Sequence, residues 1–263
     1  MSVLRASGVS VRLGGAEVLR DVDLAVTGGE LVALAGPNGA GKSTLLGALA
    51  GDVALDSGEV TLDGRGVQTV APTVLARQRA VLLQQQGLSF GFRVADVVRM
   101  GRSPWHRTPE ADRDDEVVAS AMGLTDVDAL ADRVFPTLSG GERARTSFAR
   151  VLAQETPVLL LDEPTAALDI RHQEALLAVA RTTARAGSAV VVVLHDLSLA
   201  AAYADRVCLL DAGRVAADGT SEEVLTPERL SAVYEHPVSV TRVDGSLVVV
   251  PVRARAEEDL CVP

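Results

Sequence analysis

The chain has 263 residues, 48% of them hydrophobic, and a formal net charge of −10. This length and hydrophobic share suit one domain with a sizeable core, while the acidic balance, without a basic stripe, argues against a nucleic-acid partner. No apolar run approaches the ~20 residues of a membrane-spanning helix, so we expect no pore within the chain, and the N-terminus has no signal-peptide pattern. Cys208 and Cys261 form no motif, which suggests a reduced cytosolic setting.

The first quarter of the chain predicts strands, a glycine-rich loop and a helix. Apolar and polar residues alternate over 9–13 and 18–26, which is typical of strands with one buried face. The apolar run 31–35 predicts a buried strand, and residues 43–50, rich in Leu and Ala and followed by a glycine, predict a helix. Residues 58–64 predict another short strand.

Between the buried strand and the helix lies a match to G-x-x-x-x-G-K-[ST], the phosphate-binding loop. Its glycines let backbone N–H groups turn toward phosphate oxygens, and the helix start adds a partial positive charge. Lys42 is expected to reach the β- and γ-phosphates, and Ser43 to offer its hydroxyl to Mg²⁺. A flexible glycine turn is the alternative, and the flanking strand and helix argue against it. The candidate nucleotide-binding residues are Gly36, Pro37, Asn38, Gly39, Ala40, Gly41, Lys42, Ser43 and Thr44.

A second apolar run, residues 158–161, ends in the acidic pair Asp162 and Glu163. An all-apolar run fits a parallel strand covered on both faces, and ligands of such sheets bind beyond the carboxyl ends of the strands. Asp162 is therefore the candidate Mg²⁺ ligand, and Glu163 the candidate general base that polarises the attacking water. A solvated strand end with two ordinary acids is the alternative, which the upstream phosphate loop disfavours.

The middle of the chain has a helical pattern. Helices are predicted at 94–100 and 110–122, and a further helix from Glu142 to about Gln154. The apolar run 189–194, directly before His195, predicts another buried strand. Strands that alternate with helices in this way indicate a parallel sheet.

The last part of the chain predicts a small accessory segment on the core. Residues 226–234 predict a short helix. Asp244-Gly245, between the apolar stretches 237–243 and 246–252, is a hairpin signal.

The motif Leu138-Ser139-Gly140-Gly141-Glu142, shortly before the acidic pair, resembles the signature of the ATP-binding cassette family. The other motifs follow in a similar order. Gln84 stands where the family has its Q-loop glutamine, with Gln85 as the alternative. Asp169 ends a match to the D-loop, and His195 matches the switch histidine.

The resemblance covers about residues 3–220 and implies roles for these positions. It implies that His195 contacts the γ-phosphate and is catalytic together with Glu163, and that Gln84 joins Ser43 and Asp162 around Mg²⁺. A glycine-rich segment before a helix is also suited to bind phosphate at the helix N-terminus. The further nucleotide-binding residues that the resemblance implies are Gln84, Leu138, Ser139, Gly140, Gly141, Glu142 and Asp169.

The resemblance also implies a fold, an α/β domain of the P-loop NTPase type spanning 1–263. Its parallel-sheet core, with an N-terminal antiparallel β part, takes residues 1–86 and 135–220. A helical subdomain, 87–134, is inserted into the core and rotates against it when ATP binds. An accessory segment, 221–263, completes the domain.

As to function, the resemblance implies an ATPase whose working unit is a head-to-tail dimer of two copies with two ATP molecules at the interface. The chain shows neither fused membrane helices, nor coiled-coil insertions, nor a second cassette, which favours a stand-alone importer subunit. Such a subunit is a peripheral protein on the cytoplasmic face of the membrane, with two permease subunits and an extracytoplasmic binding protein as partners. A soluble ATPase without membrane partners is the alternative.

Cargo is indicated by shorter resemblances. Residues 169–173 and 100–105 are similar to the iron-chelate and cobalamin importers, and residues 234–238 and 248–253 are most similar to haem-importer cassettes. Haem is therefore the favoured cargo, with ferric siderophores and cobalamin as alternatives. The simpler interpretations are a plain turn at 101–105 and an exposed helix start at 171–173.

One position departs from the family pattern. Many members place an aromatic residue near the end of the first strand to stack on adenine, and here Leu13 occupies that place. The base would then rest on an aliphatic surface, and discrimination between bases would be weak.

Overall fold

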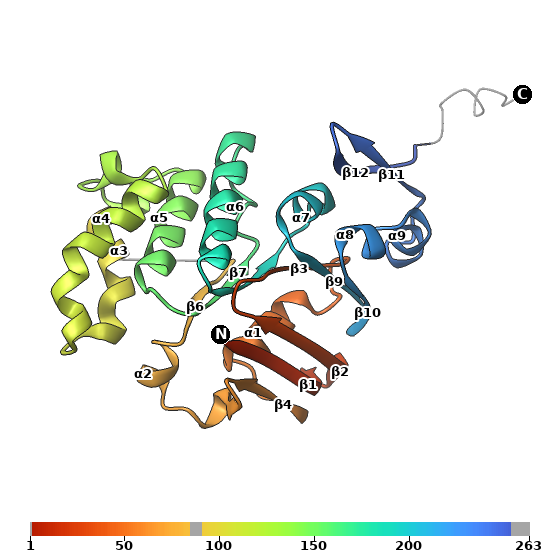
Figure 1. Ribbon diagram of the computed structural model, residues 1–263, viewed down its shortest axis with the longest axis horizontal. Coiled ribbons are helices and arrows are strands. Elements are labelled where there is room, and N and C mark those ends of the chain that lie inside the picture. Colours follow the sequence, from red (N-terminus) through yellow and green to blue (C-terminus); the bar gives the residue numbers. More distant parts are fainter. Residues whose placement is uncertain (1, 85–90, 254–263) are drawn as a thin grey trace, which may run out of the picture.

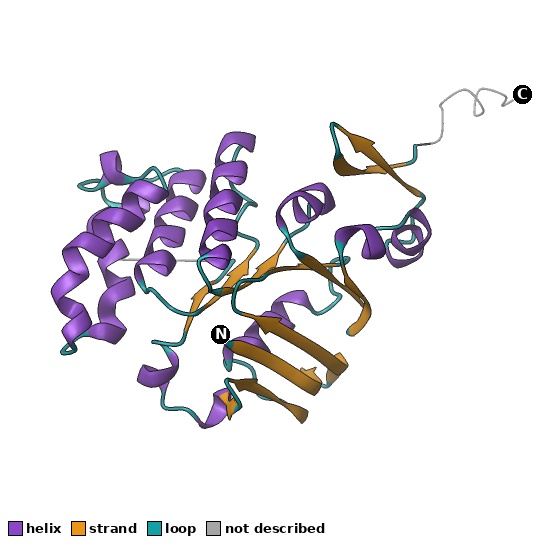
Figure 2. Ribbon diagram, viewed as in Figure 1, coloured by secondary structure: helices purple, strands orange, loops and turns teal. Residues whose placement is uncertain are grey.

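The computed structural model describes residues 2–84 and 91–253, which form three sheets surrounded by helices (Figures 1 and 2). The largest sheet has the strand order β10-β9-β3-β8-β7-β6. Its strands run parallel except at the β9–β10 edge, which is antiparallel. Every residue of β3, β7 and β8 is buried, as expected for parallel strands covered on both faces. The six strands are β3 (Leu31–Ala35), β6 (Arg79–Leu82), β7 (Val158–Asp162), β8 (Ala189–Val193), β9 (Arg206–Asp211) and β10 (Arg214–Gly219).

An antiparallel sheet with the order β2-β1-β4-β5 packs against one face of the large sheet, with α1 (Lys42–Ala50) between them. Alternate residues of β2, among them Leu24 and Val26, point into this shared core, so the predicted strands with one buried face are confirmed. A short helix, α2 (Pro72–Leu75), leads from this sheet to β6. The four strands are β1 (Val3–Leu13), β2 (Ala16–Thr27), β4 (Ser57–Leu62) and β5 (Arg65–Gly66).

The opposite face of the large sheet is covered by helices, which form a second core with it. Figure 1 shows α5, α6 and α7 side by side along this face, with α8 and α9 beyond α7. The helices are α5 (Gly140–Ala153), α6 (Ile170–Arg185), α7 (Leu197–Tyr203), α8 (Ser221–Val224) and α9 (Pro227–Val233).

A third core lies among α3 (Val94–Arg99), α4 (Asp114–Leu124) and α5. The helix predicted at 94–100 is confirmed. The helix predicted at 110–122 begins only at Asp114, because residues 109–113 form a 3₁₀ turn that starts with a proline. The division of the chain into a core and a movable helical subdomain stays a prediction.

Helix α5 starts two residues earlier than predicted, at Gly140 rather than Glu142. Ser139 is its N-cap: the Ser139 hydroxyl accepts from the Glu142 N–H, and the Glu142 carboxylate accepts from the Ser139 N–H. This reciprocal capping box offsets the poor helix propensity of two glycines in the first turn.

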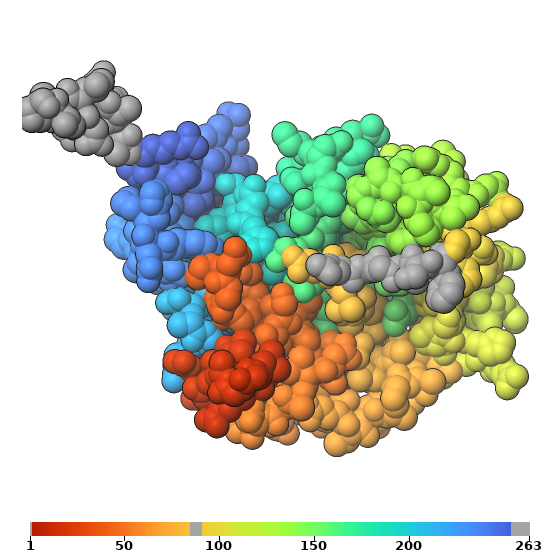
Figure 3. Space-filling view, turned by 180° about the vertical axis from the view of Figure 1, so that it is seen from behind, coloured from red at the N-terminus to blue at the C-terminus, as the bar shows by residue number. Residues whose placement is uncertain are grey.

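The predicted C-terminal helix and hairpin are both present, as α9 and the pair β11 (Val238–Val243) and β12 (Ser246–Pro251). Asp244 and Gly245, both with positive φ, form the two-residue turn. Seen from behind, this segment and the helices around α4 lie at opposite edges of the molecule (Figure 3). In the described ranges 2–84 and 91–253, every helix is too short or too polar to cross a lipid bilayer.

Candidate functional site

The phosphate loop, residues 36–44, joins the carboxyl end of β3 to α1. Gly36 has φ 139°, and a Cβ at this position would lie 2.2 Å from the Leu210 carbonyl oxygen, so a side chain is excluded on two grounds. Gly41 is the N-cap of α1 and supplies no side-chain cap. The first N–H groups of α1 are therefore not capped by that residue, which suits an anion-binding helix start.

Lys42 folds back over this loop. Its Nζ donates to the carbonyl oxygens of Gly36 at 2.8 Å and Pro37 at 2.9 Å, and the residue is 6% exposed. Burial lowers the pKa of Lys42, while the charges of Glu163 and Asp162 act in the opposite direction. Beside Lys42 lies a cavity of about 190 Å³ in which a phosphate chain would meet the ammonium group. The cavity is lined by Val18, Asn38, Gly39, Gly41, Lys42, Ser43, Thr44 and Glu163.

Asp162, the last residue of β7, lies next to the start of α1. The Ser43 hydroxyl donates to Asp162 Oδ1 at 3.2 Å. Burial raises the pKa of Asp162, although the Ser43 hydrogen bond opposes this shift. A buried carboxylate beside a hydroxyl oxygen, next to a phosphate-binding loop, is a donor set that suits Mg²⁺, which takes one or two protein oxygens and completes its shell with water and phosphate.

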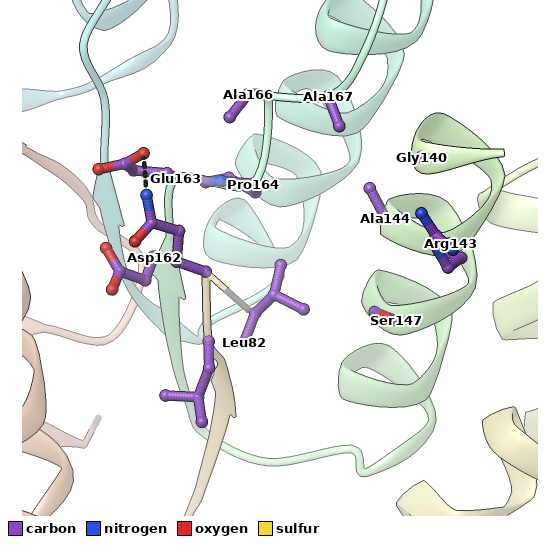
Figure 4. A pocket seen from close by; sticks show the side chains of 12 residues that line it. Leu82, Gly140, Arg143, Ala144, Ser147, Asp162, Glu163, Pro164, Ala166 and Ala167 are labelled. Atoms are coloured by element: carbon purple, nitrogen blue, oxygen red, sulfur yellow. Dashed lines mark hydrogen bonds between the residues drawn. The ribbon is translucent and has the colours of Figure 1, made fainter. Parts of the chain in front are cut away.

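Glu163 lies at the centre of the site. Its backbone is left-handed, with φ 47°, an uncommon conformation for a residue with a side chain. Glu163 Oε1 lies 2.6 Å from His195 Nε2, and Glu163 Oε2 accepts from Gln84 Nε2 at 2.8 Å. Figure 4 shows this last bond, with the Glu163 side chain turned away from α5. The structure therefore brings together three residues that were expected to act together.

Glu163 also borders three cavities, of about 190, 220 and 140 Å³. The 190 Å³ cavity is lined by the phosphate loop. The second lies between Gln84 and the first turns of α5, and the third beside His195 and Asp196. A carboxylate that borders all three spaces is placed to meet a water molecule beside a bound phosphate. Gln85, the alternative to Gln84, lies outside the described residues.

The signature residues 138–142 lie apart from the phosphate loop of their own chain. Gly140 lines the 220 Å³ cleft, whereas the lining of the loop cavity comprises Val18, loop residues and Glu163. Glu142 is engaged in the capping box and lies 2.9 Å from Arg133, and the Ser139 hydrogen bonds lower its pKa. The residues predicted to contact nucleotide thus form two groups in one chain: the phosphate loop, and the signature residues 138–142.

Asp169 is the N-cap of α6 and directly follows Ala167 and Leu168, which lie beside Gly141 of the signature. Its Oδ1 accepts from the His172 backbone N–H at 2.9 Å and lies 2.7 Å from His172 Nδ1. The His172 backbone hydrogen bond lowers the pKa of Asp169. Residues 171–173 do lie at the start of α6, but only Arg171 is exposed, whereas His172 and Gln173 are half-buried.

The segment 101–105 is more than a plain turn. Arg102 is buried, donates to Asp114 and Glu155, and lies over the Trp105 ring. The Trp105 indole N–H donates to the Gln154 carbonyl at 2.7 Å. These contacts hold residues 101–105 against the C-terminal end of α5.

The sequence did not reveal three residues that shape the loop. Val18 lines the loop cavity, Leu210 meets Gly36, and the Gly213 N–H donates to the Ala40 carbonyl at 3.2 Å. They come from β2, β9 and the β9–β10 turn, and no local pattern marks them. Leu13, at the end of β1, is 49% exposed and thus open to contact with a base.

The chain resembles known proteins over most of its length. The ABC transporter family matches residues 19–166. The hemin import ATP-binding protein HmuV of Nocardia farcinica is 59% identical over 95% of this chain and 89% of its own length. The protein of the same name from Streptomyces coelicolor is 58% identical over 95% of this chain and 90% of its own.

Two solved structures have the same fold. One is an inward-facing putative metal-chelate type ABC transporter, with a TM-score of 0.81 and 27% identity over 96% of this chain and 98% of that chain. The other is the dimeric structure of a bacterial ABC transporter cassette, with a TM-score of 0.75 and 25% identity over 83% and 98%. The α/β fold of the P-loop NTPase type, with its antiparallel part, is thereby confirmed, and the chain belongs to the ABC transporter family as an ATP-binding cassette.

Proposed function

We propose that this protein hydrolyses ATP to power haem import, as a peripheral subunit on the cytoplasmic face of the membrane. The observation that carries the ATPase activity is the position of Glu163, bonded to Gln84 and paired with His195 beside the phosphate loop. The cargo is supported by the relatives from Nocardia farcinica and Streptomyces coelicolor, which are 59% and 58% identical to this chain over the aligned residues and are named hemin import ATP-binding proteins.

In this proposal each residue has a defined task. The loop N–H groups and Lys42 bind the phosphates of ATP. Glu163 accepts a proton from water as the water oxygen bonds to the γ-phosphorus and the bond to the ADP oxygen breaks. His195 holds the γ-phosphate and orients Glu163 through their 2.6 Å contact.

Ser43 and Asp162 would hold Mg²⁺, with Gln84 as a further ligand. When bound, the ion neutralises charge that develops on the phosphate oxygens. Asp162 is protonated more readily than an ordinary aspartate because it is buried, so ion binding must compete with that proton.

A second copy of the chain is the proposed direct partner. Residues 138–142 and Asp169 lie apart from the loop of their own chain, so they are free to close over ATP held by another copy. The dimeric cassette with the same fold supports this arrangement. Two permease subunits and an extracytoplasmic haem-binding protein complete the proposed importer, and the helical part 87–134 rotates when the dimer closes.

The test is growth of a strain that lacks this protein, with haem or a ferric siderophore as the sole iron source. We expect loss of growth on haem alone, restored by the wild type but not by Glu163→Gln. Loss on the siderophore alone would replace the cargo and keep the ATPase. Unimpaired growth on both, without redundancy among neighbouring importer genes, would refute the import role.

A further inference from the structure

The C-terminal hairpin contacts the helix that directly follows His195. We propose that β12 fastens the first turn of α7 and thereby positions His195 against Glu163, so that the accessory segment contributes to ATP turnover. The inference rests on the role proposed for His195, but its structural part is separately testable.

The hairpin register explains how β12 reaches α7. With a two-residue turn at 244–245, Val243 and Ser246 form the first hydrogen-bonded pair, so Val240 and Val249 form a non-hydrogen-bonded pair. The Val249 N–H therefore points away from β11, toward the outer edge of the hairpin. At the next such position the chain has Pro251, which has no N–H to leave unpaired.

The outward Val249 N–H donates to the Ser198 hydroxyl at 3.2 Å. Ser198 belongs to the first turn of α7, and its own backbone N–H donates to the N-cap Asp196 at 2.8 Å. Asp196 immediately follows His195 in the chain. A hydrogen bond from β12 thus acts three residues from the histidine, in the helical turn that follows it.

Two hydrogen bonds between α6 and α7 lie at the far end of α7. The Arg181 side chain donates to the Ala202 carbonyl at 2.9 Å, and the Tyr203 hydroxyl donates to the Glu174 carbonyl at 3.2 Å. Both contacts come from α6 and hold the last turn. The Ser198–Val249 bond is therefore placed to fix the first turn, at the opposite end of α7 from these two α6 hydrogen bonds.

Apolar contacts strengthen this attachment. Val240 and Val249 pack against the same core as Leu199 of α7. Tyr234, at the end of α9, packs there too; burial raises its pKa, and the nearby backbone of Gly36 in the phosphate loop opposes this shift. The accessory segment thus contacts the helix after His195 and lies near the start of the phosphate loop.

Single substitutions in the full-length chain separate this positioning role from general stability. Ser198→Ala removes the acceptor, and Val249→Pro removes the donor at a position where no β11–β12 ladder bond is lost. Val249→Ala keeps the N–H but loses packing, and Ser239→Ala alters an exposed serine of the same hairpin. Each is made with and without His195→Ala.

We expect Ser198→Ala and Val249→Pro to lower kcat for ATP about 2- to 10-fold, as loss of one hydrogen bond can, with KM within twofold. The two changes should not add, and neither should lower turnover further in the His195→Ala background. In NMR spectra of protein with isotope-labelled histidine, Ser198→Ala and Val249→Pro should shift or broaden the ring signal of His195, whereas Ser239→Ala should not.

An unchanged His195 signal, or an equal further loss of turnover without His195, would overturn the inference. If His195→Ala itself keeps full turnover while Ser198→Ala moves the ring signal, then the role of His195 fails and the structural attachment stands. A variant that unfolds is replaced by the other member of the Ser198–Val249 pair.

Discussion

Glu163 and His195 face each other, with 2.6 Å between Glu163 Oε1 and His195 Nε2, because they follow neighbouring parallel strands in matched register. Asp162 pairs with Val193 at the carboxyl ends of β7 and β8. Glu163 follows Asp162 by one residue and His195 follows Val193 by two, so the carboxylate and the imidazole meet at the same edge of the sheet. The contact between Glu163 and His195 thus depends on the register of the sheet, and the left-handed backbone of Glu163 directs its carboxylate toward the imidazole.

The first prediction concerns Glu163→Gln. An amide of the same shape cannot accept the proton of water, so we expect turnover to fall by about 100-fold or more, the usual contribution of a general base. ATP binding should persist, and the variant should accumulate as a closed dimer in size-exclusion chromatography with ATP. Glu59→Gln, on the exposed side of β4, is the matched control and should behave as wild type. Turnover at the wild-type rate in Glu163→Gln would refute the assignment of the base.

The second prediction is a pH dependence from Asp162. Its pKa is raised on folding by burial, so the protonated form stabilises the fold below the unfolded pKa, and this contribution is lost as the pH rises through the folded pKa. Without nucleotide, Asp162→Asn should therefore melt above wild type at pH 7, and the difference should shrink toward pH 4. Each kcal/mol corresponds to about 2–4 °C at this chain length.

Melting curves between pH 4 and pH 8 measure this difference, and the exposed Asp112→Asn serves as the control. With Mg·ATP the order should reverse, because the variant lacks the carboxylate proposed to hold the ion. A destabilised Asp162→Asn at pH 7 without nucleotide would mean that the charge of Asp162 is needed for folding.

Much of the site is predictable from local sequence. Strands β3 and β8 are continuous apolar runs, and β7 is apolar up to its last residue, Asp162. Each strand is followed within two residues by a residue of the site or of the phosphate loop. The position of His195 beside Glu163 then follows from the rule that parallel strands bring their carboxyl ends to one edge. These features depend on a few neighbouring residues, so a single sequence contains them.

The remaining features depend on contacts between distant segments. Leu210 closes on Gly36, and Val249 reaches Ser198 across 51 positions of the chain. No periodicity marks such pairs, because each residue looks like an ordinary strand or helix position. The start of α5 is different: Ser139 and Glu142 spell a capping box, and this local signal identifies the true helix start in spite of two glycines.

The third prediction concerns Gly36→Ala. The new methyl group would meet the Leu210 carbonyl at 2.2 Å, and the backbone at φ 139° is strained for any side chain. We expect a loss of about 1–3 kcal/mol in the free energy of unfolding, together with weaker ATP binding, since the loop must move. Gly64→Ala is the control, because its φ is also positive but no atom lies within 4 Å of the new methyl group. Equal effects of the two changes would show that strain rather than the clash dominates.

The fourth prediction concerns the base of the nucleotide. Leu13 is half exposed at the end of β1, where the family commonly has an aromatic residue. An aliphatic side chain gives up the stacking energy of about 1–3 kcal/mol that an aromatic ring supplies to any base. Leu13→Tyr should therefore tighten ATP and GTP binding alike, by about fivefold or more, and leave their ratio nearly unchanged, because every base has a π face.

Titration of both nucleotides against the purified chain measures this effect. Leu124→Tyr, at an exposed leucine of α4, adds the same ring elsewhere and should leave both affinities unchanged. Because stacking discriminates little among bases, the wild type should bind GTP within about tenfold of ATP. A Leu13→Tyr variant with unchanged affinity would mean that the base rests away from the end of β1, and a strong preference of the wild type for ATP would require a polar contact to the adenine edge.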